Sequence, residues 1–143
     1  ASEFKTGRAS RWGMILLAVL SALFIISGPF VMDSAGTLQS EATLHGTIHG
    51  LAGGFVFLLM TVTIFVFLRR FRIDTDWRPI YSWTFFLGVI EAAAVLIFTI
   101  LSKAPGLESN VSGWIGLIQR AALVPFMVWV FLFASTLQNR SAS

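Results

Sequence analysis

Long apolar stretches alternate with short polar segments along the chain, and four of the stretches are long enough to form membrane-spanning helices. They run from about residue 12 to 31, 44 to 68, 81 to 101 and 113 to 137. About 20 mainly apolar residues carry an α-helix across the hydrocarbon core of a bilayer. The pattern therefore predicts an all-α membrane protein with a bundle of four transmembrane helices over residues 12–138.

Composition supports a membrane protein and excludes an ordinary soluble domain. The 143 residues are 56% hydrophobic and 12% charged, whereas a soluble domain carries about 25% charged residues. The net charge of +3 does not indicate nucleic-acid binding, because the basic residues flank the apolar stretches, as topology signals do. The absence of cysteine excludes disulfides, thiolate metal sites and cysteine nucleophiles.

The basic residues predict the orientation. They flank the first and last stretches and fill the connection between the second and third: Lys5, Arg8, Arg11, Arg69, Arg70, Arg72, Arg78 and Arg140. The other two connections hold Lys103 with Asp33, Glu41 and Glu108. Because Lys and Arg favour the cytoplasmic side, we predict that both termini are cytoplasmic. Residues 1–11 are then a cytoplasmic segment or residues left by cloning, and residues 139–143 form a cytoplasmic tail.

Two charged residues lie deep in the predicted spans and mark the first candidate site. Glu91 falls in the third span and Arg120 in the fourth, where a charge is costly and usually paired or functional. Their predicted depths overlap, so we expect them to touch directly or through one water, with Gln119 and Ser27 nearby. A ligand, ion or proton site and a purely structural pair both fit this pattern.

Two histidines open the second span. Glu41, His45 and His49 are four residues apart and share one helical face. One interpretation is a metal site with Glu41 or Asp33 as a third ligand. We favour the other, in which the histidines bond to loop carbonyls or to Glu41, because no HExxH motif or cysteine accompanies them.

Small residues and a proline indicate how the helices pack. Gly46, Gly50 and Gly54 form overlapping small-xxx-small steps, which permit close helix approach. We expect this face to pack on another span of the bundle, near Ala92–Ala94, or on another membrane protein. Pro125 should kink the last helix and free a carbonyl near Ala121.

Two segments resemble the prokaryotic membrane family known as domain of unknown function 998. The first is FVMDSAGTLQSEATLHGTIHGLAGGFVF, with Pro29, Asp33, His45, His49 and Gly50 as matching positions. The second is GWIGLIQRAALVPFMVW, with Gly116, Gln119, Arg120 and Trp129. The resemblance implies the last four helices of a six-helix, multi-pass protein of the prokaryotic inner membrane, and it implies no established activity.

These observations favour a small binding or accessory membrane protein with an outward-facing polar pocket, and catalysis is not expected. The predicted ligand-binding residues are Asp33, Glu41, His45, His49, Glu91, Gln119 and Arg120. One alternative is a component that transports protons or a small solute through Glu91. Another is a membrane enzyme with a metal bound to His45 and His49. The bilayer is the expected partner, a small ligand is possible, nucleic acid is not expected, and no cofactor is indicated.

Overall fold

The computed structural model describes residues 8–34, 37, 39–103 and 113–141, and it contains helices but no strand within these residues. The long helices are α1 (Arg8–Ser27), α2 (Leu44–Ile73), α3 (Arg78–Lys103) and α5 (Ile115–Ser141). Two short 3-10 helices, η1 (Gln39–Glu41) and η2 (Thr75–Trp77), precede α2 and α3. The all-helical class predicted from the sequence is confirmed.

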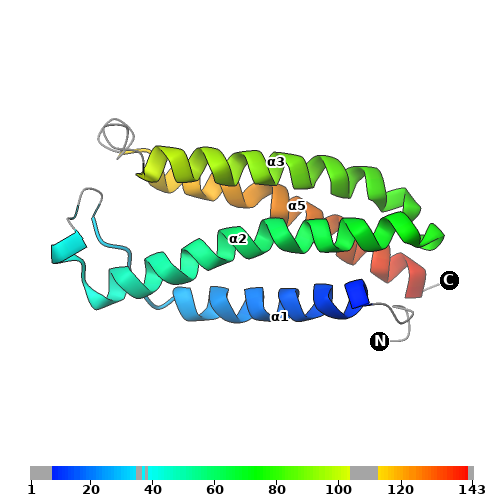
Figure 1. Ribbon diagram of the computed structural model, residues 1–143, viewed down its shortest axis with the longest axis horizontal. Helices are drawn as coiled ribbons and strands as arrows, with labels where there is room; N and C mark the ends of the chain where they lie inside the picture. The colour runs from blue at the N-terminus through cyan, green and yellow to red at the C-terminus, as the bar shows by residue number, and fades with distance from the viewer. Residues whose placement is uncertain (1–7, 35–36, 38, 104–112, 142–143) are drawn as a thin grey trace.

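The helices lie side by side as an elongated bundle, and α2 is central (Figure 1). Helix α1 packs along one side of α2, and α3 and α5 pack on the other side and against each other. The marked N- and C-terminal ends lie at the same end of the bundle (Figure 1). The helices that hold the candidate site, α3 and α5, are thus direct neighbours.

Three helical segments are long and apolar enough to cross a membrane: Leu44–Ile73, Thr75–Ser102 and Ile115–Arg140. The apolar part of α1, Arg11–Ser27, is shorter. The chain is therefore a membrane helical bundle, and a fourth crossing by α1 stays a prediction. The helix in α1 ends before the predicted limit near residue 31, because Pro29 disfavours helical geometry in the residue before it.

An aromatic core fills the bundle toward the end that carries η2. Phe71 stacks on Trp77 with ring centroids 5.1 Å apart, and Trp129 stacks on Phe133 at 5.5 Å. Phe67 contacts both Trp129 and Phe133. The Trp129 indole N–H donates to Thr84 Oγ1 at 3.2 Å, so this buried ring also has its polar atom satisfied.

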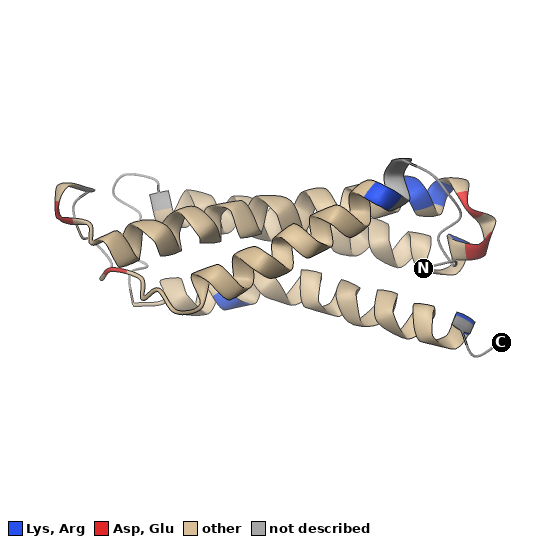
Figure 2. Cartoon of the chain, turned by 90° about the horizontal axis from the view of Figure 1, so that it is seen from below, with Lys and Arg blue, Asp and Glu red and all other residues tan. Residues whose placement is uncertain are grey.

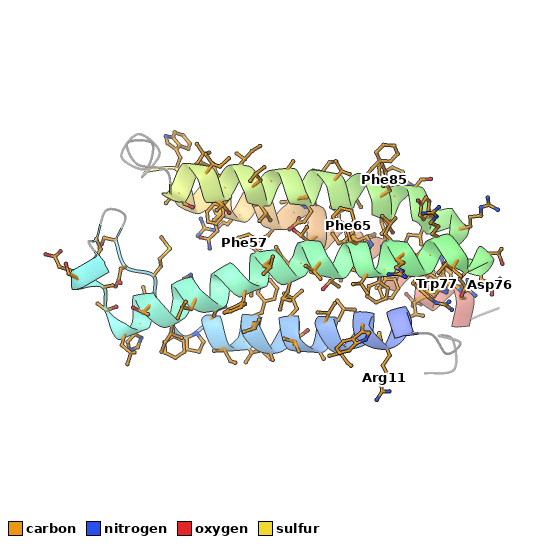
Figure 3. All side chains as sticks on the ribbon, in the orientation of Figure 1. Arg11, Phe57, Phe65, Asp76, Trp77 and Phe85 are labelled. Carbon is orange, nitrogen blue, oxygen red and sulfur yellow. The ribbon has the colours of Figure 1, made fainter. Side chains whose placement is uncertain are left out.

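The outside of the bundle suits a lipid solvent. Many large apolar side chains are exposed, including Phe85, which points away from the helices (Figure 3). Phe57 instead lies between helices and packs on Phe98 at 4.9 Å (Figure 3). Most of the Lys and Arg residues, drawn blue, lie at the end of the bundle where both termini are marked (Figure 2). Charge at the ends and apolar surface between them is the pattern that a bilayer requires.

Salt bridges hold the connection between α2 and α3 at that end. Arg70 pairs with Asp74 at 2.6 Å, and the Asp74 backbone N–H donates to the Arg70 carbonyl at 3.2 Å. Arg140 of α5 bonds the Asp76 carbonyl and carboxylate and lies 4.8 Å from the Trp77 ring centroid. Helix α2 ends at Ile73, beyond the predicted limit near residue 68. The arginine-rich turn after residue 68 is helical, and the pair of Arg70 with Asp74 stabilises its end.

Candidate functional site

Glu91 is the most unusual residue of the bundle. It lies near the middle of α3, about 20 Å along the helix from Arg78, and its side chain is 0% exposed. An ionisable residue at this depth is a functional-site candidate by default. Its surroundings are supplied by α5, which packs alongside α3.

The partner of Glu91 is a backbone group of α5. The Phe126 N–H donates to Glu91 Oε2 at 3.1 Å. This amide directly follows Pro125, which lies inside α5 and has no N–H of its own. The carboxyl group of α3 therefore reaches the place where the hydrogen-bond ladder of α5 is broken.

The second oxygen of the carboxyl group has no such partner. Glu91 Oε1 is buried and makes no hydrogen bond in the part of the chain that the structure describes. Leaving a buried polar atom unpaired costs about 1–3 kcal/mol. A group that supplies a proton, a hydrogen-bond donor or a positive charge would remove this cost.

The predicted direct contact between Glu91 and Arg120 is wrong. Arg120 is exposed, and its Nη1 donates to the Gly116 carbonyl of its own helix at 3.3 Å. Arg120 precedes Phe126 by about one and two-thirds helical turns, so it leaves α5 on a different face. Its side chain runs back toward the start of α5, the way long basic side chains reach the membrane interface. Glu91 lies beside Phe126, about 9 Å farther along α5 than Arg120. The estimates of depth and of helix rotation therefore both differ from the structure.

Asp33 anchors the connection between α1 and α2. Its carboxylate accepts from the Thr43 backbone N–H at 3.0 Å and from the Thr43 hydroxyl at 2.6 Å. Thr43 in turn caps α2, because its Oγ1 accepts from the Gly46 N–H at 3.0 Å. A Cβ on Gly46 would lie 2.0 Å from Asp33 Oδ2. Gly46 therefore makes room for the carboxylate that orders the start of α2.

The two histidines lie in the first turns of α2, beside this connection. Only His49 bonds backbone carbonyls, as the favoured interpretation expects. His49 Nδ1 lies 2.9 Å from the Phe30 carbonyl and 3.3 Å from the Ser27 carbonyl. Nδ1 is therefore the protonated ring nitrogen, since only a donor satisfies a carbonyl. His45 is exposed and packs its ring on Phe30 at 5.4 Å. Glu41 is exposed at the end of η1, and Gln119 is half-buried near the start of α5.

The predicted site residues thus fall into separate places. Asp33, His45 and His49 share the turn between α1 and α2, Glu91 lies at the α3–α5 contact, and Arg120 lies on the exposed side of α5. Within the described ranges, no group of three His, Asp or Glu side chains is placed to hold a metal ion. These contacts do not bring Glu91, Arg120 and His49 together in a single pocket.

The glycine face of α2 also differs from the expectation. A Cβ placed on Gly50, Gly53 or Gly54 would meet nothing within 4 Å, so these positions do not pack on another described helix. Gly88 of α3 packs instead on Ile64, whose Cγ2 would lie 2.9 Å from an added Cβ. The close approach of α2 and α3 occurs nearer the middle of the bundle than the sequence steps suggested.

Sequence reasoning missed two groups, the Phe126 N–H that bonds Glu91 and the Thr43 hydroxyl that caps α2. Pro125 was the available signal for the first, because it breaks the ladder of α5 beside Phe126. A threonine directly before an apolar helix was the signal for the second.

Most of the sequence matches one known family. Residues 1–136 match the family described as "Protein of unknown function (DUF998)". The chain belongs to this family. The resemblance seen in the connection between α1 and α2 and in α5 is therefore confirmed. No curated protein and no solved structure matches it.

Proposed function

We propose that this DUF998 protein is a small integral membrane binding or accessory protein, without catalysis, whose ligand is held at Glu91. The observation that carries the proposal is the fully buried carboxyl group with one oxygen unpaired among the described atoms. A group so costly to bury is rarely kept in a membrane span without a role.

The chemistry of the unpaired oxygen limits the ligand. An ionised carboxylate only accepts hydrogen bonds, and the Phe126 N–H already serves Oε2. The ligand must therefore bring a proton, an N–H or O–H donor, or a positive charge to Oε1. Anionic or purely apolar ligands do not meet this requirement.

The core between Glu91 and the η2 end favours binding over transport. Trp77, Trp129, Phe67 and Phe71 are 0% exposed and pack on one another there. A path for a proton or a polar solute needs polar groups or water along its length, and close-packed aromatic rings supply neither. The closed aromatic core therefore supports a binding site that a ligand enters from one side, and it does not support a passage through the bundle.

The same proposal includes orientation and partners. We place the arginine-rich end in the cytoplasm of a prokaryotic cell, in the inner membrane, because basic residues gather there. The accessory role is supported by the open positions at Gly50, Gly53 and Gly54, which leave room for a helix of another membrane protein. The metal-enzyme alternative is weakened, because no three His, Asp or Glu side chains among the described residues are placed to hold a metal ion.

Proton flux decides between binding and transport. The purified protein is reconstituted into vesicles that contain a pH-sensitive dye, and a pH gradient is applied with valinomycin and potassium to cancel the membrane potential. We expect the dye signal to decay at the rate of protein-free vesicles for the parent and for Glu91→Gln. Faster decay with the parent than with Glu91→Gln would establish the transport alternative and refute the proposed function.

A further inference from the structure

We propose that the ligand of Glu91 is a proton, and that the neutral carboxyl group closes the break in α5. In this arrangement Oε2 accepts from the Phe126 N–H, and the Oε1–H donates to the Ala121 carbonyl. We call this pair of bonds the α3–α5 clasp. The inference rests on the proposed role of Glu91 and names the ligand that it takes.

The argument begins with the broken ladder of α5. In a continuous helix the N–H of residue 125 would donate to the carbonyl of residue 121. Pro125 has no N–H, so the Ala121 carbonyl loses its usual donor. Ala121 lies on the exposed side of α5, and a membrane interior offers its carbonyl no bulk water in place of the lost donor.

Position brings the carboxyl group to this carbonyl. Glu91 Oε2 is bonded to the Phe126 N–H at 3.1 Å, one residue beyond Pro125. Helix carbonyls point along the axis toward the residue four positions later, so the Ala121 carbonyl points at the turn that Glu91 already contacts. Oε1 is attached to the same carbon as Oε2 and is the oxygen left without a partner in the described chain.

Counting donors and acceptors then selects the protonation state. The helix break offers one donor, the Phe126 N–H, and two acceptors, the Ala121 carbonyl and the Ala122 carbonyl, whose usual donor is that same N–H. A neutral carboxylic acid has an acceptor oxygen for the N–H and an O–H donor for one carbonyl, and the Ala121 carbonyl is the one that Pro125 leaves without any backbone donor. A carboxylate has acceptors only, so Oε1 and the Ala121 carbonyl would both stay unpaired and would repel each other.

No other described ionisable side chain is placed to balance a charge on Glu91. The ionisable residues of α2 lie near its ends, and Arg11 of α1 points away from the bundle (Figure 3). In α5, Arg120 bonds the Gly116 carbonyl and Arg140 bonds Asp76. The other ionisable side chains of α3 that the structure describes are Arg78 and Tyr81, toward the start of the helix. A proton is therefore the positive charge that fits this site.

Loss of the proton should loosen the contact between α3 and α5. Ionisation removes the Oε1–H donor and leaves a buried negative charge, which is more costly than an unpaired neutral group. The stabilising contribution of the clasp is thus present at low pH and lost as the pH rises through the ionisation of Glu91. The two helices are coupled to proton binding without any path for the proton across the bundle.

Thermal unfolding of the purified full chain in detergent tests the clasp. Glu91→Gln keeps the shape and has an N–H donor and a carbonyl acceptor, but it cannot ionise. We expect Glu91→Gln to match the parent at pH 6 and to exceed it increasingly toward pH 9. Glu91→Leu should unfold at a temperature lower than that of Glu91→Gln by roughly 5 °C or more at both pH values. Comparing the parent with Glu91→Gln at each pH cancels the titration of all other groups.

A second variant isolates the helix break. Pro125→Ala restores the N–H that serves the Ala121 carbonyl, so the difference between Gln and Leu at position 91 should shrink in that background. Infrared spectra should show the C=O stretch of a protonated carboxylic acid in the parent at pH 6, absent from Glu91→Gln.

Three results would overturn the clasp. One is a Glu91→Gln protein as unstable as Glu91→Leu. Another is a difference between the parent and Glu91→Gln that does not change with pH. The third is a parent without the protonated-carboxyl band at pH 6. The flux assay reports on transport alone. Proton flux through the parent would therefore refute the proposed function and leave the clasp untouched, and a failed unfolding test would refute the clasp without showing transport.

Discussion

At the residue scale, the sharpest contrast lies between two glycines on α2. Gly46→Ala places a methyl group on the Asp33 carboxylate and displaces the acceptor of the Thr43 N–H and hydroxyl. We expect a loss of about 1–2 kcal/mol in the free energy of unfolding, as for a lost helix cap. Gly50→Ala meets open space and should be neutral or stabilising by up to about 1 kcal/mol. Thermal unfolding in detergent compares them, and equal losses would contradict this account of Asp33.

The same residues show what a sequence reveals at this scale. Glu91, Asp33 and His49 were identifiable, because polar side chains stand out in apolar stretches. Their partners were not identifiable, because Glu91 and His49 bond backbone groups, and every residue except proline carries the same donor and acceptor. Only the local exceptions, such as Pro125, leave a trace in the sequence.

At the scale of the helix, rotation decides which residues meet. Glu91 faces α5 and is buried, whereas Arg120 is exposed on α5 and bonds Gly116. We therefore predict that the two residues are energetically independent. In thermal unfolding, Glu91→Leu should be strongly destabilising, Arg120→Leu should have a small effect, and the double variant should equal their sum within about 0.5 kcal/mol. A double variant more stable than Glu91→Leu would show that Glu91 and Arg120 interact after all.

Helix bounds were predicted in part. The start of α2 at Leu44 agrees with the predicted limit near residue 44. Helix α1 ends at Ser27, before the predicted limit near residue 31, although Pro29 was an available signal. The extension of α2 to Ile73 was not predicted, because it depends on the salt bridge between Arg70 and Asp74. Register between helices was the weakest inference, since the packing of Gly88 on Ile64 depends on the shapes of many side chains together.

At the scale of the whole molecule, hydropathy was sufficient for the architecture. Apolar stretches of spanning length force helices, because a bilayer leaves backbone groups no other partner. The α1 segment is the exception, since its apolar part, Arg11–Ser27, is shorter than the other three spans, and its packing along α2 is what favours the predicted fourth crossing. No comparable rule fixes the site, because one buried carboxyl group is compatible with several ligands until its neighbours are known.

The orientation of the bundle is testable because the chain has no cysteine. Thr75 lies in η2 at the arginine-rich end, and Ser34 lies in the connection between α1 and α2, and both are exposed. Single cysteines at each position are treated in intact cells with a thiol reagent that does not cross membranes. We expect labelling at position 34 and none at position 75 until the cells are broken, because the arginines favour the cytoplasmic side. Labelling at 75 alone would reverse the orientation and would place the η2 end, not the α1–α2 turn, outside. Labelling at both positions in intact cells would mean that α2 does not cross the membrane between them, and the bundle could not be the one that its hydropathy predicts.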